Sequence, residues 1–486
     1  MKRICPILFV TLSVLAAFAD VHTPSTFPSL VPLPRELKVN EGELELEAAS
    51  IDKLPITEHK AKDLPKEGYR LVVDACGIRV DASTPAGFFY ARQTLRQLAV
   101  RSGQTLRVPF VEIKDEPAYA WRGLMLDEGR HFFGKETVKR ILDRMASEKL
   151  NVFHWHLTED QGWRIALDKF PELEKYATVR AESVARTWTH ANKVKDGKRY
   201  GPYFYTRAEL EEVVAYARER FIEVVPEVEL PGHARAALAA YPQYSCLGER
   251  LKPREAWSDI GVCPEVFCAG NDEALKFLEG VLDEVCDIFP SKAIHFGGDE
   301  CPKTRWRACA KCQRRVREEG LKDVEALQGW MTRRFAAYLA KKGRTAIGWH
   351  EILAGGADPR TTVVQNWRQP SIGVAAATNG FRVIQSPYLE TYFSFPQGLG
   401  AKDPYTYRSP GHQLTLEKAY QFDPAAGLTD RTNLLGSECC LWTEMVFDEK
   451  EVFWKLWPRA SAFAEAVWTA PKPRDFKGFL RRCQSL

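Results

Sequence analysis

The stretch Ala293-Ile294-His295-Phe296-Gly297-Gly298-Asp299-Glu300 is a short apolar run that ends abruptly in two glycines and two adjacent carboxylates. The run is typical of a buried strand, and side chains alternate along a strand, so Asp299 and Glu300 are expected to reach different parts of one site. The glycines would let a ligand approach the backbone closely. Adjacent acids repel when both ionise, so one is expected to stay protonated near neutral pH. Such a pair suits acid-catalysed glycoside cleavage, although a strand that ends in solvated acids is the alternative interpretation.

The rest of the chain after Pro117 alternates between strand-like and helix-like patterns. Strands are expected at Trp121–Leu126, Val152–Leu157, Ile222–Val228, Ala293–Phe296, Thr345–Trp349, Val363–Trp367, Arg382–Ser386 and Leu434–Leu441. Helices are expected at Lys135–Lys149, Arg207–Arg220, Glu273–Ile288, Val324–Lys342 and Trp454–Val467. This α/β alternation predicts parallel βαβ units that close into a (β/α)8 TIM barrel over residues 118–486. An open doubly wound sheet is disfavoured because no Gly-x-Gly-x-x-Gly turn follows a strand.

A smaller α+β accessory domain is predicted before the barrel, over residues 27–115. Short apolar runs alternate with turns there, at Leu44–Glu47, Tyr69–Val73 and Gly77–Val80. The segment Gly87–Val100 has apolar residues three and four positions apart, which predicts a helix.

Residues 1–19 have the pattern of a secretory signal peptide. Lys2 and Arg3 precede an almost wholly apolar run, and Ala17-Phe18-Ala19 has the small-x-small form of a cleavage site, which places the mature start at Asp20. The apolar run is shorter than the ~20 residues of a membrane-spanning helix. We therefore expect an exported, periplasmic or extracellular protein with no membrane anchor after cleavage.

Charge and cysteine content limit the partners and cofactors. A net charge of +4 from 68 basic and 64 acidic residues favours neither nucleic acid nor an anionic membrane as a partner. Of 12 cysteines, 11 follow the signal segment, and Cys246, Cys263 and Cys268 lie close enough in sequence to supply a disulfide. Cys309-x-x-Cys312 is half of a zinc motif, but no second pair at metal-site spacing follows it. Disulfides or free thiols are therefore favoured over zinc, and neither a metal nor another cofactor is expected.

Polar and aromatic residues flank the expected barrel strands, and a barrel of this kind forms its active site at the carboxyl ends of its strands. The candidates are Arg122, Asp127, His154, His156, Glu159, Asp160, Glu227, Glu229, His233, Asp299, Glu300, Trp349, Glu351, Trp367, Tyr392, Trp442 and Glu444. Each alone is compatible with an ordinary buried residue, but their shared position on one face indicates a site.

Five ordered motifs in the chain resemble the family 20 glycoside hydrolases, the β-N-acetylhexosaminidases. They are Trp121–Asp127 with Arg130–Phe132, Lys149–Arg164, Pro226–His233, His295–Glu300 and Leu441–Glu444. Two earlier segments, Gly68–Arg70 and Gly87–Leu95, look like the accessory domain of that family. The resemblance covers nearly all of the chain after the signal segment.

The resemblance implies exo-acting hydrolysis, with retention, of terminal β-linked N-acetylglucosamine or N-acetylgalactosamine from a glycan or chitooligosaccharide. The family is a substrate-assisted exception to the two-carboxylate scheme: the 2-acetamido oxygen of the substrate attacks the anomeric carbon and forms an oxazolinium ion. By this resemblance Glu300 is the general acid/base, and Asp299 accepts from the acetamido N–H and stabilises its positive charge.

The same resemblance implies roles for eight further residues. Arg122 would bind the sugar 3- and 4-hydroxyls, Tyr392 would donate to the acetamido oxygen, and Glu444 would accept from a ring hydroxyl. Trp349, Trp367 and Trp442 would wall the acetamido methyl and stack the ring. Glu159 and His233 would form a relay behind Glu300.

Two other hypotheses for the function remain open. One is a non-catalytic sugar-binding relic of the same barrel, which the presence of the expected site residues disfavours. The other is a two-carboxylate retaining glycosidase, which needs a second acid ~5 Å from Glu300; Glu351 and Glu444 are its candidates. Ser394 stands where many family members have an acid, two positions after Tyr392, which bears on how the 4- and 6-hydroxyls are held.

Overall fold

A computed structural model of the chain describes residues 28–47, 50–187, 192–251, 255–398, 412–469 and 474–484. The predicted signal segment and its cleavage point lie outside these residues. Among the helices of the described ranges, none combines the length and the apolar character that a bilayer crossing requires.

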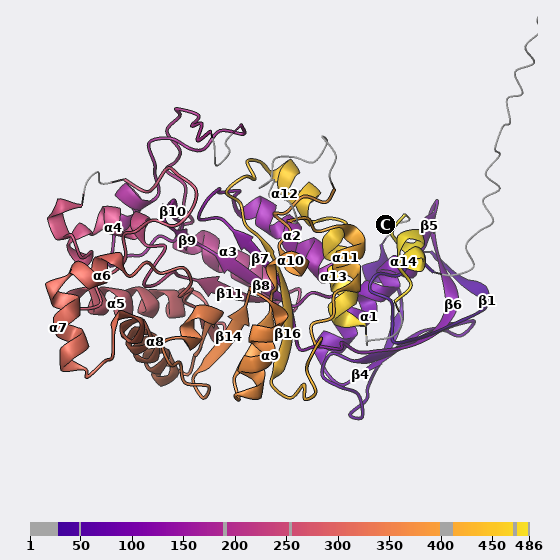
Figure 1. Cartoon of the computed structure of the whole chain (residues 1–486). Helices are drawn as coiled ribbons and strands as arrows, with labels where there is room; N and C mark the ends of the chain where they lie inside the picture. The colour runs from indigo at the N-terminus through magenta and orange to yellow at the C-terminus, as the bar shows by residue number, and fades with distance from the viewer. Residues whose placement is uncertain are drawn as a thin grey trace, which may run out of the picture.

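Eight parallel strands close into a barrel (Figure 1). They are β7 (Trp121–Asp127), β8 (Val152–His156), β11 (Glu223–Glu227), β12 (Ala293–His295), β13 (Thr345–Trp349), β14 (Thr362–Asn366), β15 (Arg382–Gln385) and β16 (Leu434–Leu441). All pair in parallel with their neighbours, and β16 pairs with β7 to close the ring. The predicted barrel is confirmed, and each predicted strand lies within about one residue of its observed bounds.

Helices on the outside of the barrel connect most successive strands. They are α2 (Lys135–Ser147), α3 (Arg207–Arg218), α5 (Asp272–Ile288), α8 (Val324–Lys341) and α9 (Pro370–Thr378). Polar N-caps start several of them: Thr206 and Glu209 form a capping box on α3, and the side chains of Asn271 and Asp323 accept backbone N–H groups of α5 and α8.

The predicted single helix Trp454–Val467 is wrong. The structure has two helices there, α12 (Glu449–Leu456) and α13 (Arg459–Trp468). Pro458 lies between them, and a proline has no N–H to donate to the preceding turn, so one helix cannot continue through it.

The loops at the carboxyl ends of the strands carry many short elements. After β8 come β9 (Thr158–Glu159), β10 (Gly162–Trp163) and η2 (Leu173–Ala177). After β11 come α4 (Arg235–Ala240), η3 (Pro242–Tyr244) and η4 (Gly248–Arg250), and after β12 come α6 (Thr304–Ala308) and α7 (Ala310–Glu318). The later ones are η5 (His350–Leu353), α10 (Tyr388–Thr391) and α11 (Leu416–Gln421). The C-terminal helix α14 (Phe476–Cys483) lies instead beside the N-terminal sheet (Figure 1).

The N-terminal sheet lies beside the barrel and carries α1 (Pro85–Leu98) on the side toward it (Figure 1). Its strands are β1 (Glu36–Glu47), β2 (Ile56–Lys60), β3 (Tyr69–Asp74), β4 (Gly77–Ala82), β5 (Val100–Ser102) and β6 (Thr105–Asp115), with η1 (Ile51–Lys53) before β2. The strand order is β1-β6-β3-β4-β2, with β5 on β6. This is the predicted small α+β unit.

Apolar side chains of the strands form one buried cluster in the barrel, made of Val152, Val225, Ile347, Val363 and Ile384. Burial of such a side chain contributes about 1.5–3 kcal/mol. A larger cluster lies between the strands and the surrounding helices. The packed barrel fixes the directions of the strands, and with them the positions of the loops.

A buried ion pair, supported by hydrogen bonds, joins the N-terminal sheet to the barrel. Asp115 of β6 accepts from Lys149 Nζ at 2.8 Å, from the Tyr69 hydroxyl at 2.7 Å and from Trp468 Nε1 at 3.0 Å. These groups come from the sheet, from the loop before β8 and from the end of α13. The two parts of the chain are therefore held by polar contacts as well as by apolar packing.

Candidate active site

A cavity of about 310 Å³ opens among the loops at the carboxyl ends of the barrel strands, at the lower end of the range for small-molecule sites. Six of the ten predicted site residues line it: Asp299, Glu300, Trp367, Tyr392, Trp442 and Glu444. It is also lined by Arg130, Gly261, Val262, Tyr388, Ser394 and Phe395.

The acid pair follows β12 through a tightly turned backbone. Gly297 has a φ of +66°, and a Cβ there would lie 1.8 Å from Glu229 Oε2, so only glycine fits. Glu300 itself has a φ of +45°, a left-handed conformation that costs about 1–3 kcal/mol in a residue with a side chain. The turn directs the two carboxylates differently: 11% of the Asp299 side chain is exposed, against 39% for Glu300.

The surroundings separate the pKa values of the two acids. Burial, and then the negative charge of Asp299, raises the pKa of Glu300. Burial alone would also raise the pKa of Asp299, but the charge of His233 and hydrogen bonding from His233 and the backbone together outweigh it, and the pKa of Asp299 is lowered. Glu300 is therefore suited to carry a proton while Asp299 stays ionised. A general acid must be protonated, and a partner that stabilises positive charge must be ionised, at the same pH.

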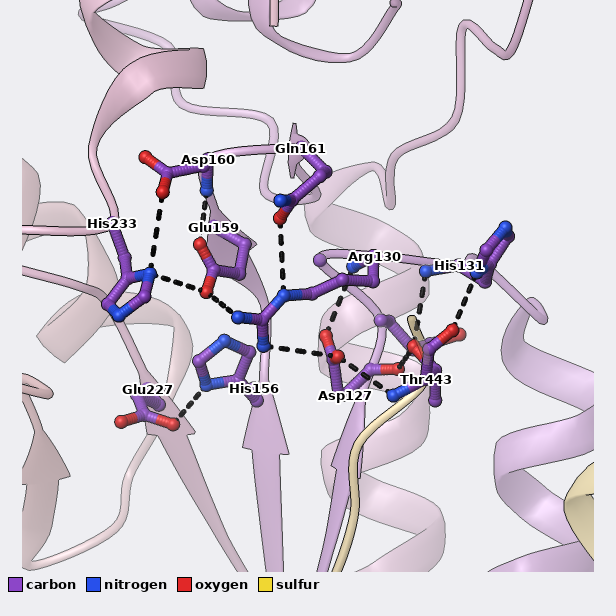
Figure 2. Close-up of polar contacts among 12 residues, drawn as sticks. Asp127, Arg130, His131, His156, Glu159, Asp160, Gln161, Glu227, His233 and Thr443 are labelled. Atoms are coloured by element: carbon purple, nitrogen blue, oxygen red, sulfur yellow. Dashed lines mark hydrogen bonds and ion pairs between the residues drawn. The ribbon is translucent and has the colours of Figure 1, made fainter. Parts of the chain in front are cut away.

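His233 lies between the acid pair and a second pair of carboxylates, Glu159 and Asp160, which Figure 2 shows beside its ring. Its Nδ1 is 2.8 Å from Glu159 Oε1, and its Nε2 is 3.5 Å from Asp299 Oδ2 and 3.8 Å from Glu300 Oε2. Burial would lower the pKa of His233, but Glu159 and Asp299 outweigh it and raise the pKa well above its ordinary value. Glu159, His233 and the acid pair are thus neighbours as predicted, and the imidazolium lies nearer to Asp299 than to Glu300.

Arg130, to which the sequence analysis assigned no role, lines the cavity. Its guanidinium contacts Glu159, Asp127 Oδ2 at 3.3 Å and Gln161 Oε1 at 3.2 Å (Figure 2), and lies 5.1 Å from the centre of the Trp442 ring. These contacts use three of its five N–H donors. They hold the guanidinium in one orientation at the cavity wall.

The prediction that Arg122 binds the sugar is wrong. Arg122 stands at the start of β7, at the amino end of the barrel, and its side chain is fully buried. Its guanidinium donates to Glu67 Oε1 at 2.7 Å and to the carbonyls of Tyr119 and Lys149. Strand direction explains the correction, because the site lies at carboxyl ends, where Arg130 follows the same strand.

Asp127 at the carboxyl end of β7 organises this side of the cavity. Its side chain accepts from the backbone N–H groups of Arg130 and Thr443, both at 3.1 Å, and its carbonyl accepts from the Thr443 hydroxyl at 2.8 Å (Figure 2). These bonds tie the turn after β16 to the loop after β7. Glu444, next to Thr443, is thereby held in the cavity wall beside Arg130.

Aromatic rings form another wall of the cavity. Tyr392 stacks on Trp367, with ring centres 6.3 Å apart and an interplanar angle of 17°, and lies 5.9 Å from Trp442. Burial raises the pKa of Tyr392 well above its ordinary value, so its hydroxyl stays neutral and able to donate. Trp349 is fully buried behind this wall, 5.8 Å from Trp442, and does not line the cavity.

Glu227 supports the site from inside the barrel. It contacts His156 (Figure 2), His295 Nδ1 at 2.7 Å, Trp349 Nε1 at 2.8 Å and His154 Nε2 at 3.1 Å. Glu227 and the three histidines are close enough to resemble a set of metal ligands. Their contacts with one another are sufficient to explain why they lie together. The hydrogen bond from Trp349 sets the orientation of the indole behind the aromatic wall.

Two family models match the chain. The model described as "Glycosyl hydrolase family 20, catalytic domain" matches residues 119–471, and "Glycosyl hydrolase family 20, domain 2" matches residues 37–116.

Curated relatives match along most of this chain. A β-hexosaminidase of Porphyromonas gingivalis is 41% identical over 437 residues, which are 87% of this chain and 53% of the relative. A β-hexosaminidase of Akkermansia muciniphila is 33% identical over 489 residues, 99% of this chain and 94% of the relative. The chain thus spans about half of the first relative and nearly all of the second.

Solved structures share the fold. An exo-β-N-acetylglucosaminidase of Vibrio harveyi, in complex with N-acetylglucosamine, is 29% identical with a TM-score of 0.85, covering 94% of this chain and 76% of that one. A β-N-acetylhexosaminidase of Bacteroides fragilis is 33% identical with a TM-score of 0.79, covering 94% of each chain.

Proposed function

Because the chain belongs to glycoside hydrolase family 20, we propose that it is an exo-acting, retaining β-N-acetylhexosaminidase. Its substrate is a glycan or chitooligosaccharide with a terminal, non-reducing, β-linked N-acetylglucosamine or N-acetylgalactosamine. The names of the curated relatives support this class of activity.

One observation carries the proposal. Asp299 Oδ1 is buried at the edge of the cavity and has no hydrogen-bond partner among the residues that the structure describes. A buried acceptor without a donor costs about 1–3 kcal/mol, and more when it is charged. A ligand that brings an N–H group, as the acetamido group of the substrate does, removes that cost. The aromatic wall beside it suits the acetamido methyl.

The first chemical step begins with Glu300 in its protonated form. Glu300 gives its proton to the glycosidic oxygen while the acetamido oxygen of the substrate attacks the anomeric carbon, so the leaving sugar departs and an oxazolinium ion remains. Asp299 accepts from the acetamido N–H and stabilises the positive charge that develops there. Tyr392 donates to the acetamido oxygen and aims it at the anomeric carbon.

In the second step Glu300, now ionised, takes a proton from water. The water oxygen attacks the anomeric carbon from the face that the leaving group left, the oxazolinium ring opens, and the sugar is released with its β configuration retained. His233 keeps Asp299 ionised in both steps, which the lowered pKa of Asp299 supports.

Arg130 takes the role of holding the sugar hydroxyls that Arg122 cannot reach. Its anchored guanidinium and the neighbouring Glu444 present a donor and an acceptor to the same side of the cavity. Such a pair suits the 3-, 4- or 6-hydroxyls of a terminal sugar. Trp442 and Trp367 supply the stacking surface.

Hydrolysis of a chromogenic β-N-acetylglucosaminide, compared with the matching plain β-glucoside, tests the proposal. We expect turnover of the first and near-inertness of the second. A relic would cleave neither substrate, and a two-carboxylate glycosidase would cleave both. In the structure Glu351 accepts from the indole of Trp367 at 3.1 Å, so this candidate nucleophile already has a partner.

A further inference from the structure

Four cysteines from two separate loops meet outside the proposed active site. Cys246 and Cys268 come from the long loop after β11, and Cys309 and Cys312 come from the segment of α6 and α7 after β12. One ligand atom from each lies within 4.8 Å of the others. Cys268 and Cys312 are buried, and the other two are half-buried.

Three of the six sulfur–sulfur separations are close to the edge length of a metal tetrahedron, and all six lie within 4.8 Å. Cys268 Sγ is 3.6 Å from Cys312 Sγ and 3.7 Å from Cys309 Sγ, and Cys246 Sγ is 3.8 Å from Cys312 Sγ. Four sulfurs bound to one zinc ion at ~2.3 Å would be about 3.8 Å apart. Paired disulfides would instead bring two sulfurs to about 2.05 Å and leave the two pairs independent of each other.

The backbone around the cysteines is built to bring them together. Cys309 is the N-cap of α7, but its side chain caps no N–H, so its sulfur is directed to the other thiols. Gly270 lies against the first turn of this helix, where a Cβ would be 2.2 Å from the Lys311 carbonyl.

We propose that Cys246, Cys268, Cys309 and Cys312 bind one zinc ion in a tetrathiolate site. Sulfur ligands in a tetrahedron suit zinc, and a site with four protein ligands leaves no open position for catalysis, so the ion is structural. The four thiols release their protons to solvent as the ion binds. The first helical turn of α7, and the basic side chains along that helix, favour the negative charge of the thiolates.

This site would clamp together the two loops that carry the active-site acids and their histidine. His233 precedes Cys246 on one loop, and Asp299 and Glu300 precede Cys309 on the other. Between them Trp306 Nε1 donates to the Phe267 carbonyl at 2.9 Å, and Arg305 is paired with Glu265. The zinc ion thus holds the loop geometry on which the short distances of His233 depend, without itself contacting a substrate.

Metal content and thiol state of the full chain test the proposal directly. The protein is purified without a metal-affinity step, and we expect about one zinc per chain, with X-ray absorption showing zinc–sulfur bonds at ~2.3 Å. Cobalt substitution should give the visible bands of a tetrahedral thiolate site. Disulfides at these cysteines, iron in place of zinc, or four free thiols that take up neither zinc nor cobalt would each overturn the proposal.

Variants separate this site from other thiols. Cys309→Ser should lower the zinc content about tenfold or more, while Cys286→Ser, at a buried thiol outside the group, should leave it unchanged.

A strong chelator should lower the unfolding temperature of the wild type but not that of a soluble Cys309→Ser protein. Equal zinc content in both variants would contradict the assignment. If Cys309→Ser does not fold, the metal analysis and the X-ray absorption spectrum of the wild type still decide whether the four cysteines bind zinc. The proposal does not depend on which sugar the enzyme cleaves.

Discussion

His233 reaches Asp299 across 3.5 Å, from imidazole Nε2 to carboxylate Oδ2, and the two residues come from loops that follow neighbouring barrel strands. The other ring nitrogen of His233 contacts Glu159. Asp299 is thus linked through the His233 imidazolium to the Glu159 carboxylate on the other side of the ring.

Replacement of this imidazolium tests its influence on both acids. His233→Gln removes a positive charge that lowers the pKa of Asp299 and also that of Glu300. Both pKa values should rise, so the acid and basic limbs of the kcat/KM profile should both move to higher pH. His59→Gln, at an exposed site of the N-terminal sheet, should leave the profile unchanged. An unshifted acid limb in His233→Gln would argue against this coupling.

The wild-type pH profile should show the separated acids. Activity should be lost at low pH as Asp299 takes up a proton, below the ordinary range of an aspartate, because its pKa is lowered. It should be lost at high pH as Glu300 loses its proton, above the ordinary range of a glutamate, because its pKa is raised. In Glu300→Gln the basic limb should disappear.

The role of Glu300 as acid can be separated from a role in binding. Glu300→Gln should lose about 10²–10⁴-fold in turnover of substrates whose leaving group needs protonation. A substrate with an acidic leaving group should suffer much less in its first step, which burst kinetics can follow. Equal losses on both kinds of substrate would remove the assignment.

The corrected arginine assignment predicts a contrast between two variants. Arg130→Lys keeps the charge but loses the fixed fork, so kcat/KM should fall by about 10-fold or more, with little change in thermal stability. Arg122→Met leaves Glu67 without its buried partner, so stability should fall by a few kcal/mol, while kcat/KM of the folded protein should be nearly unchanged. Thermal unfolding and steady-state kinetics on both proteins give the comparison, and a selective loss of kcat/KM in Arg122→Met would restore the original assignment.

The substrate-assisted route predicts how Asp299 and the acetamido group depend on each other. Asp299→Asn should lower the rate because a neutral amide cannot offset positive charge on the acetamido nitrogen. A thiazoline mimic of the oxazolinium ion should inhibit the wild type strongly and this variant much less. A covalent sugar adduct trapped on a carboxylate would show that the protein supplies the nucleophile.

Export is also open to a direct measurement. The signal-like segment predicts that the mature chain begins at or near Asp20 and lies outside the cytoplasm. N-terminal sequencing of the native protein from separated cell fractions should find this start in the exported fraction. A native protein that keeps residues 1–19 would contradict the prediction.

The barrel was predictable because its strands have a strong local signal. Most are largely apolar runs bounded by polar residues, and helices of regular period lie between most of them. The helix predicted across Pro458 was wrong because the apolar spacing continues across this residue, whereas a helical backbone cannot. The position of the acid pair was predictable because two glycines and two adjacent carboxylates directly follow an apolar strand.

The parts of the site that depend on three-dimensional placement were not predictable in the same way. Arg122 and Arg130 lie in one motif, and only the direction of β7 assigns them to opposite ends of the barrel. Trp349 is the last residue of the expected strand, but it lies behind the cavity wall. The four cysteines of the proposed zinc site are spread over 67 positions of the sequence, and Cys246 and Cys268 lack the close spacing by which metal motifs are recognised.

The buried junction between the N-terminal sheet and the barrel has a consequence for how this protein can vary. Asp115, Lys149 and Trp468 share one desolvated network, and Arg122 and Glu67 share another. A barrel separated from its sheet would keep Lys149 and Arg122 as cations with no carboxylate to meet them. The two modules therefore cannot be exchanged freely with those of other proteins, and substitutions on one side of the junction constrain those that the other side can accept.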